Sequence, residues 1–105
     1  MSYDEDAVLL TVTGSEQNRN GFGEDTLERT EVFVGRKKTT RTEAYKAMQE
    51  GHTVAVTLAL DASEYEAAIK NDIQPKYAEY QGVKYRILRV YGDGSGEMEL
   101  ILQEG

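Results

Sequence analysis

The sequence predicts a mainly β protein: a small antiparallel β-barrel of about six strands, with one short α-helix at about residues 41–50 and a long flexible loop at residues 14–26. Two observations carry this prediction. Residues 77–102 contain three successive runs of alternating apolar and polar residues separated by glycine-containing turns, the pattern of a β-meander. Further strand-like runs precede them. At 105 residues, the chain is expected to form a single domain, residues 1–105.

The composition narrows the function classes. The formal net charge is −7, and a protein that binds duplex DNA would normally present a basic face, so ordinary nucleic-acid binding is disfavoured. The acidity favours solubility, or alternatively a surface that DNA passes without adhering. Cysteine is absent, so no disulfide is expected. No apolar run approaches the ~20 residues of a membrane helix, and the acidic start is unlike a signal peptide.

The first two strands are predicted at residues 8–13 and 27–39, and they are expected to pair with each other. In the second strand Val32 and Val34 fall on one side and Phe33 on the other. One face of this strand is therefore suited to a core.

The connection between these strands, residues 14–26, lacks any periodicity and predicts the long flexible loop. Loops of this length within a small domain are usually functional or disordered. Phe22 is a lone aromatic residue among glycines, so it either packs back onto the domain or contacts a partner. With Arg19, it is a candidate contact residue in assembly.

A basic cluster follows the second strand and contains Arg36, Lys37, Lys38 and Arg41. Three interpretations remain open for it. The cluster binds phosphate, or it binds an acidic patch on a neighbouring subunit, or it is the solvated end of a strand.

The helix is predicted from a capping box, in which Thr40 accepts the backbone N–H of Glu43 and the Glu43 carboxylate reaches back to the N–H of Thr40. Gly51 is placed to end it. One apolar stripe for docking on the sheet consists of Ala44, Tyr45, Ala47 and Met48. Within this stripe, Tyr45 and Met48 are expected to lie in the core.

Residues 52–60 alternate cleanly and predict a strand whose inward side chains are Val54, Val56, Leu58 and Leu60. Residues 61–75 leave two alternatives. Ser63 and Glu66 form a second capping box that begins a single helical turn, or the segment is an irregular crossover ending at Pro75.

The closing meander has one irregularity. Val83, Tyr85 and Ile87 share a face, whereas Leu88 and Val90 shift the apolar parity by one residue. This shift predicts a bulge, or a strand whose far end is covered on both faces.

No catalytic constellation is found in the sequence. The single histidine, His52, has no acidic residue nearby at a metal-ligand spacing, and no serine lies in a nucleophile-elbow context. The segment around Gly21 and Gly23 lacks the lysine and the strand-to-helix setting of a phosphate loop. We therefore expect no catalytic residue, no cofactor and no metal, and we expect that the protein is not an enzyme.

Several motifs, in order along nearly the whole chain, resemble the head-closure or head-tail adaptor (head-tail joining) family of tailed phages and prophages of Gram-positive bacteria. The motifs are the start Met1-Ser-Tyr-Asp with Leu9-Leu10, the strand end Lys37-Lys38, the helix start Arg41-Thr-Glu-Ala-Tyr45-Lys-Ala with Gly51, the hairpin at residues 79–91, and the closing Met98-Glu-Leu-Ile-Leu102.

The resemblance implies a structural protein that forms a homo-oligomeric ring in the virion neck. Such a ring lies between the portal-bound adaptor and the tail or tail-completion protein, and it helps to close the DNA exit channel. The resemblance also implies assembly in the bacterial host cytoplasm without a membrane, and it carries over no catalytic residues. DNA would pass through without sequence-specific binding, because an acidic lumen repels phosphates.

Within this interpretation, the candidate assembly or channel contacts are Arg19, Phe22, Arg36, Lys37, Lys38 and Arg41. Two other classes remain open. An oligonucleotide-binding module would place basic and aromatic residues on one sheet face, whereas Lys84 and Arg86 alternate with Tyr85. A generic interaction domain would have one fixed heteromeric partner and no ring.

Overall fold

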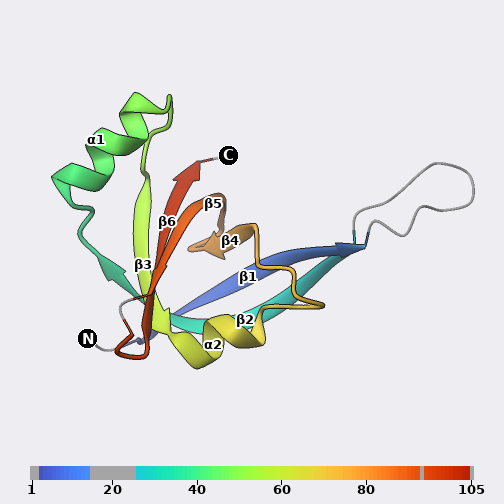
Figure 1. The fold of residues 1–105 in the computed structure, drawn as a ribbon. Helices are drawn as coiled ribbons and strands as arrows, with labels where there is room; N and C mark the ends of the chain where they lie inside the picture. Colours follow the sequence, from blue (N-terminus) through green and yellow to red (C-terminus); the bar gives the residue numbers. More distant parts are fainter. Residues whose placement is uncertain (1–2, 15–25, 93, 105) are drawn as a thin grey trace, which may run out of the picture.

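The alternating runs close into a barrel in the computed structural model, which describes residues 3–14, 26–92 and 94–104 (Figure 1). Its six strands are β1 (Glu5–Gly14), β2 (Thr26–Lys37), β3 (Val56–Asp61), β4 (Tyr77–Tyr80), β5 (Val83–Gly92) and β6 (Glu97–Glu104). The described residues also form two helices, α1 (Arg41–Gln49) and α2 (Ala62–Ala67). Neighbouring strands are antiparallel in the order β1-β2-β3-β6-β5-β4, and β4 pairs back with β1. The predicted six-stranded antiparallel barrel is confirmed.

The interior of the barrel is filled by one side of each strand, as expected for alternating sequences. In β2, Val32 and Val34 are buried and Phe33 is 54% exposed, as predicted. In β1 the inward residues are Ala7 and Leu9. The other buried strand residues of this core are Val56, Leu58, Leu60, Ala78, Tyr80, Leu100 and Leu102.

Strands β1 and β2 form a ribbon that is longer than the sheet around it (Figure 1). Strand β4 pairs only with residues 7–10 of β1, and β3 pairs only with residues 34–37 of β2. Gly14 and Thr26, predicted as loop ends, pair with each other in the ribbon. The rest of the predicted loop, with Arg19 and Phe22, lies outside the described residues.

Helix α2 resolves the choice left open for residues 61–75, because a short helix does begin the crossover. Its N-cap is Asp61, whose carboxylate accepts the N–H of Ser63 at 3.1 Å, and not Ser63 itself as predicted. Tyr65 and Ala68 join the buried core, and the Thr11 hydroxyl donates to the Ala68 carbonyl at 2.6 Å. The helix therefore covers one end of the barrel interior.

The meander carries the predicted bulge. The pairing of β5 with β6 shifts register between Ile87 and Arg89, which accounts for the change of apolar parity in this strand. The β4–β5 turn places Gln81 at φ 51° and Gly82 at φ 77°, the backbone of a two-residue hairpin turn with two positive φ angles.

Strand β3 begins at Val56 and not at residue 52, so the predicted strand is four residues too long at its start. Thr57 and Ala59, predicted to face outward, are buried as well. One cause is the segment after β2, where the Thr39 hydroxyl lies 2.8 Å from that of Thr57. The strand is therefore covered on both faces.

Candidate interaction surface

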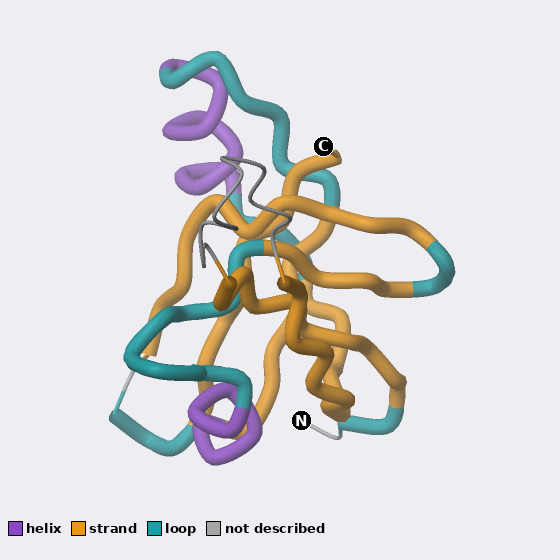
Figure 2. Tube along the Cα trace, turned by 90° about the vertical axis from the view of Figure 1, so that its right-hand side faces the viewer, coloured by secondary structure: helices purple, strands orange, loops and turns teal. Residues whose placement is uncertain are grey.

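Helix α1 stands away from the barrel, at the opposite end of the molecule from α2 (Figures 1 and 2). The helix itself is confirmed, with Thr40 as its N-cap. Its predicted apolar docking face is wrong for two of its residues, since Tyr45 is 63% exposed and Met48 is 70% exposed. The side that faces the barrel carries the buried residues Glu43 and Ala47.

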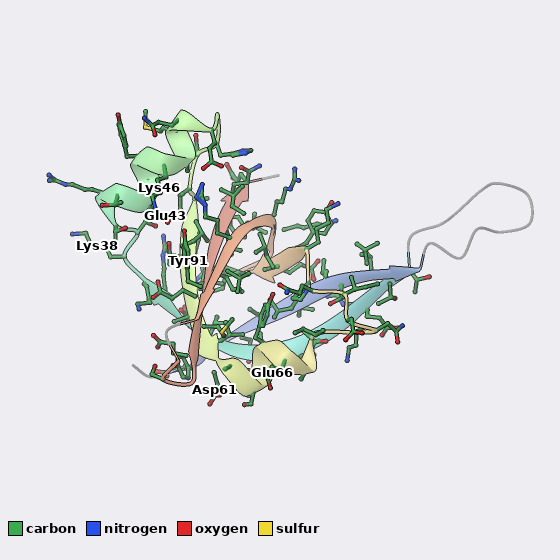
Figure 3. The ribbon with its side chains drawn as sticks, in the orientation of Figure 1. Lys38, Glu43, Lys46, Asp61, Glu66 and Tyr91 are labelled. Carbon is green, nitrogen blue, oxygen red and sulfur yellow. The ribbon has the colours of Figure 1, made fainter. Side chains whose placement is uncertain are left out.

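A carboxylate attaches α1 to the sheet. Arg89 Nη1 of β5 donates to Glu43 Oε1 at 3.2 Å, and the Tyr91 hydroxyl donates to Glu43 Oε2 at 2.9 Å (Figure 3). Arg89 also forms an ion pair with Glu50 at the end of the helix. Side-chain exposures of 19% for Arg89 and 11% for Glu43 shield this pair from water, so it is worth more than a surface ion pair.

The capping box is therefore only half formed. Thr40 accepts the Glu43 N–H at 3.2 Å, but the Glu43 carboxylate binds β5 and does not return to the N–H of Thr40. Partial burial, together with the hydrogen bond to Glu43, raises the pKa of Tyr91 above its ordinary value. Both effects favour the neutral phenol. The Tyr91 hydroxyl therefore stays protonated and can donate the hydrogen bond that holds α1.

Three residues of the predicted basic cluster, Arg36, Lys37 and Lys38, line one hollow of about 440 Å³, which Thr39 and Thr57 also line, but their side chains make different contacts. Lys37 points to β6, where its Nζ lies 3.0 Å from Glu99 and 3.4 Å from Glu97. The hydrogen bond to Glu99 raises the pKa of Lys37. Because Lys37 already has partners within its own chain, its charge is less available to a second subunit.

Arg36 lies at the end of the barrel that α2 does not cover. It belongs to the inward-facing register of β2, and its charge acts on Tyr80, whose hydroxyl donates to Glu5 at 2.8 Å. Burial and the bond to Glu5 raise the pKa of Tyr80, and Arg36 opposes them.

The remaining members of the cluster, Lys38 and Arg41, are exposed at the start of α1. Arg41, Tyr45 and Met48 are spaced i, i+4 and i+7, which places them on one stripe of the helix. Lys38, in the segment before the helix, and Lys46, about 100° around the helix from Tyr45, are also exposed (Figure 3). None of these three cations forms an ion pair with another described residue. We refer to Lys38, Arg41, Tyr45, Lys46 and Met48 as the helix surface.

A second surface lies on the outside of β4, β1 and β2. Two hollows of about 360 Å³ and 300 Å³ meet there on β1, and both are lined by Asp6 and Val8. Glu31 and Phe33 complete one of them, and Glu79 lines the other. Their described lining includes no lysine or arginine. We refer to Asp6, Val8, Glu31, Phe33 and Glu79 as the acidic trough.

The strand order places the two surfaces on opposite sides of the barrel. Strand β1, at the centre of the acidic trough, is three strands from β6 in either direction. Helix α1 is bonded to β5 through Glu43, and the segment before it is bonded to β3 through Thr39. Lys37, the last residue of β2, is bonded to β6. The barrel wall thus separates a cationic, partly apolar surface from an acidic one.

A third feature bears on nucleic-acid binding. Tyr77 lies on the outer face of β4, and Lys84 Nζ is 4.3 Å from the centre of its ring. Arg86 is the direct cross-strand partner of Tyr77. Tyr85 points into the core as the sequence predicted, but Tyr77 shares a face with both cations. The sequence did not reveal this, because the grouping depends on the β4–β5 register.

No protein-family model and no curated protein matches this chain. In the described part of the chain, no group of three or more histidine, aspartate or glutamate residues is placed to hold a metal ion. Neither described helix is long and apolar enough to span a bilayer. The phage-family resemblance therefore continues to rest on the order of its motifs.

Proposed function

We propose that this protein is a structural component of the neck of a tailed phage virion. Copies of it would form a ring between the portal-bound adaptor and the tail, and the ring would help to close the DNA exit channel. The observation that carries the proposal is the helix surface. A helix fixed by a shielded ion pair presents Arg41, Tyr45 and Met48 to solvent, and arginine, tyrosine and methionine are enriched in protein–protein interfaces.

Two other observations agree with this proposal. The resemblance implies a small β-barrel with one short helix, and the fold agrees with it in the barrel and in α1 but adds a second helix, α2. The net charge of −7 suits a component that DNA passes, because like charges keep the phosphate backbone from adhering. No sequence-specific contact with DNA is required of it.

Gene deletion in the phage or induced prophage that encodes the protein tests the proposal. Electron microscopy of the lysate is expected to show emptied heads beside free, complete tails, and a plasmid copy of the gene is expected to restore joined particles. A neighbouring tail gene, deleted in parallel, provides the control, because its loss removes tails and leaves filled heads. Normal infectious particles from the deletion strain would refute the neck assignment.

Tyr77 and its neighbouring cations Lys84 and Arg86 support a second candidate function, the binding of single-stranded nucleic acid. An aromatic ring between cations is a stacking platform for bases, and Lys76 also lies 5.8 Å from the ring centre. Fluorescence anisotropy with a labelled oligonucleotide at low salt distinguishes this activity. Binding that is lost in Tyr77→Ala and retained in Tyr45→Ala would favour the second candidate over the neck role.

A further inference from the structure

We propose that the helix surface of one copy binds the acidic trough of the next copy, so that the protein assembles head to tail. This inference rests on the ring in the proposed function and assigns the contact that builds it. The partner is a second copy of this chain.

Charge complementarity identifies that partner. The helix surface presents the cations Lys38, Arg41 and Lys46, none of which is paired with a described carboxylate. The trough presents Asp6, Glu31 and Glu79. Asp6 and Glu31 form no ion pair with a described residue, whereas Glu79 is paired with Arg29 at the edge of the trough. Opposite charges on two patches of one molecule favour contact between different patches of neighbouring copies.

Apolar groups accompany the charges on both surfaces. Tyr45 and Met48 are among the most exposed large apolar side chains in the described part of the chain, and Phe33 is 54% exposed beside Asp6 and Glu31. In many protein interfaces an aromatic side chain at the centre supplies much of the binding energy. The charged residues around it set the association rate and the specificity. Tyr45 is therefore assigned as the anchor.

The placement of the surfaces selects the symmetry. Two helix surfaces facing each other across a two-fold axis would bring like charges together, and so would two troughs. Because the surfaces lie on opposite sides of the barrel, their contact is heterologous, and successive copies form a ring or a filament. Each copy therefore presents its helix surface on one side of the barrel and its acidic trough on the other.

Carbodiimide cross-linking of the unmodified protein tests which surfaces meet. This reagent joins lysines directly to carboxylates, and a mixture of unlabelled and ¹⁵N-labelled chains identifies cross-links between copies by mass spectrometry. At concentrations up to about 1 mM, we expect Lys38 and Lys46 to link to Asp6, Glu31 or Glu79 of another copy. Absence of these links, or links from the helix surface to a different region, would overturn the inference.

Charge reversal provides the second test. The double variants Lys38→Glu/Arg41→Glu and Asp6→Lys/Glu31→Lys each reverse the net charge of one surface, and all four sites are exposed. A glutamate in the first turn also suits the helix dipole, so folding is preserved. Each variant alone is expected to associate at least about tenfold more weakly in sedimentation velocity, as is Tyr45→Ala. An equal mixture of the two reversed variants is expected to regain association, because each helix surface then meets a trough of opposite charge.

Glu66→Lys on α2 is the matched control, since it reverses an exposed charge outside both surfaces and is expected to associate as the wild type does. Failure of the mixed variants to regain association would overturn the head-to-tail contact. The deletion experiment tests the neck role separately. Emptied heads and free tails together with a failed mixture would leave the neck role in place and remove only this contact.

Discussion

At the scale of single residues, Glu43 determines how α1 is presented. A glutamate in the first turn of a helix is ordinarily a capping residue, but here both carboxylate oxygens are taken by Arg89 and Tyr91 of β5. The helix is therefore attached through a polar contact on its inner side. Its apolar side chains Tyr45 and Met48 turn outward as a consequence, and they become available to a partner.

Arg89→Ala tests this attachment. It removes the partner of Glu43 and Glu50, and the loss of charged hydrogen bonds at a shielded site is expected to lower the free energy of unfolding by about 2 kcal/mol. Urea denaturation measures the change, and amide exchange within α1 is expected to accelerate more than in the barrel. Arg86→Ala, at an exposed site on the same strand, is expected to change stability by less than about 0.5 kcal/mol. Equal effects of the two substitutions would contradict the account.

The pH dependence follows from the groups whose pKa is raised in the folded protein, namely Tyr3, Lys37, Tyr65, Tyr80 and Tyr91. The folded state holds these protons more tightly than the unfolded chain, whose tyrosines and lysines titrate near 10.0 and 10.5. Their contribution to stability is therefore complete at neutral pH, and it is lost as the pH rises above about 10.

The Tyr80→Phe variant checks this direction. Urea midpoints measured from pH 7 to 11 are expected to fall at alkaline pH in the wild type, and to fall less steeply in the variant because one raised tyrosine is gone. A midpoint that rises with pH in this range would contradict the pKa directions. An identical slope in the two proteins would remove Tyr80 from the explanation.

At the scale of elements, the two helices have opposite roles. Helix α2 inserts Tyr65 and Ala68 into the core, whereas the exposed face of α1 carries the larger apolar side chains of that helix. Only α2 fills one end of the barrel with its side chains. The exposed side chains of α1 contribute little to stability, so this apolar face is free to serve an interface.

Substitutions on the exposed face of α1 test this division. The double variant Tyr45→Ala/Met48→Ala is expected to leave the urea midpoint almost unchanged, within about 0.5 kcal/mol, because both side chains lie in solvent and alanine favours a helix. Ala47→Asp, which places a charge at a fully buried site of the same helix, provides the contrast and is expected to destabilise it. A large loss in the double variant would place these residues in the core after all.

The packing of Tyr65 in the core can be tested separately. Tyr65→Ala leaves a cavity at one end of the barrel and is expected to cost about 3 to 5 kcal/mol. Tyr65→Phe keeps the ring and loses only the hydrogen bond of 2.8 Å to Gln74, so it is expected to cost about 1 kcal/mol. Thermal unfolding of the two variants gives the comparison, and similar losses in both would show that the ring does not fill the core.

The helices and strands that are defined by hydrophobic periodicity and by turn residues were predictable from the sequence. The alternation in residues 77–102 predicted β4, β5 and β6, and the parity shift at Leu88 gave a bulge as one of two alternatives, which the register of β5 with β6 confirms. The orientation of α1 was not predictable, because the sheet-facing side of the helix depends on the position of Arg89 across the fold. The start of β3 was misplaced because residues 52–55 continue its alternation without pairing as strand.

At the scale of the whole molecule, barrel closure separates charges that are mixed along the chain. Arg36, Lys37 and Lys38 are consecutive, yet one lies at a barrel end, one is paired with β6 and one joins the helix surface. The acidic trough gathers Asp6, Glu31 and Glu79 from three strands, which no local pattern predicts. The candidate site is therefore a product of topology, and only its basic half was visible in the sequence.

The measurement that tests the neck assignment most directly is a cryo-electron microscopy reconstruction of the neck of particles from the phage or prophage that encodes this chain. We expect a ring between portal and tail whose density fits the six-stranded barrel, with α1 of each copy against β1 and β2 of the next. A neck built without this barrel would contradict the assignment, even if the isolated chain associates in solution.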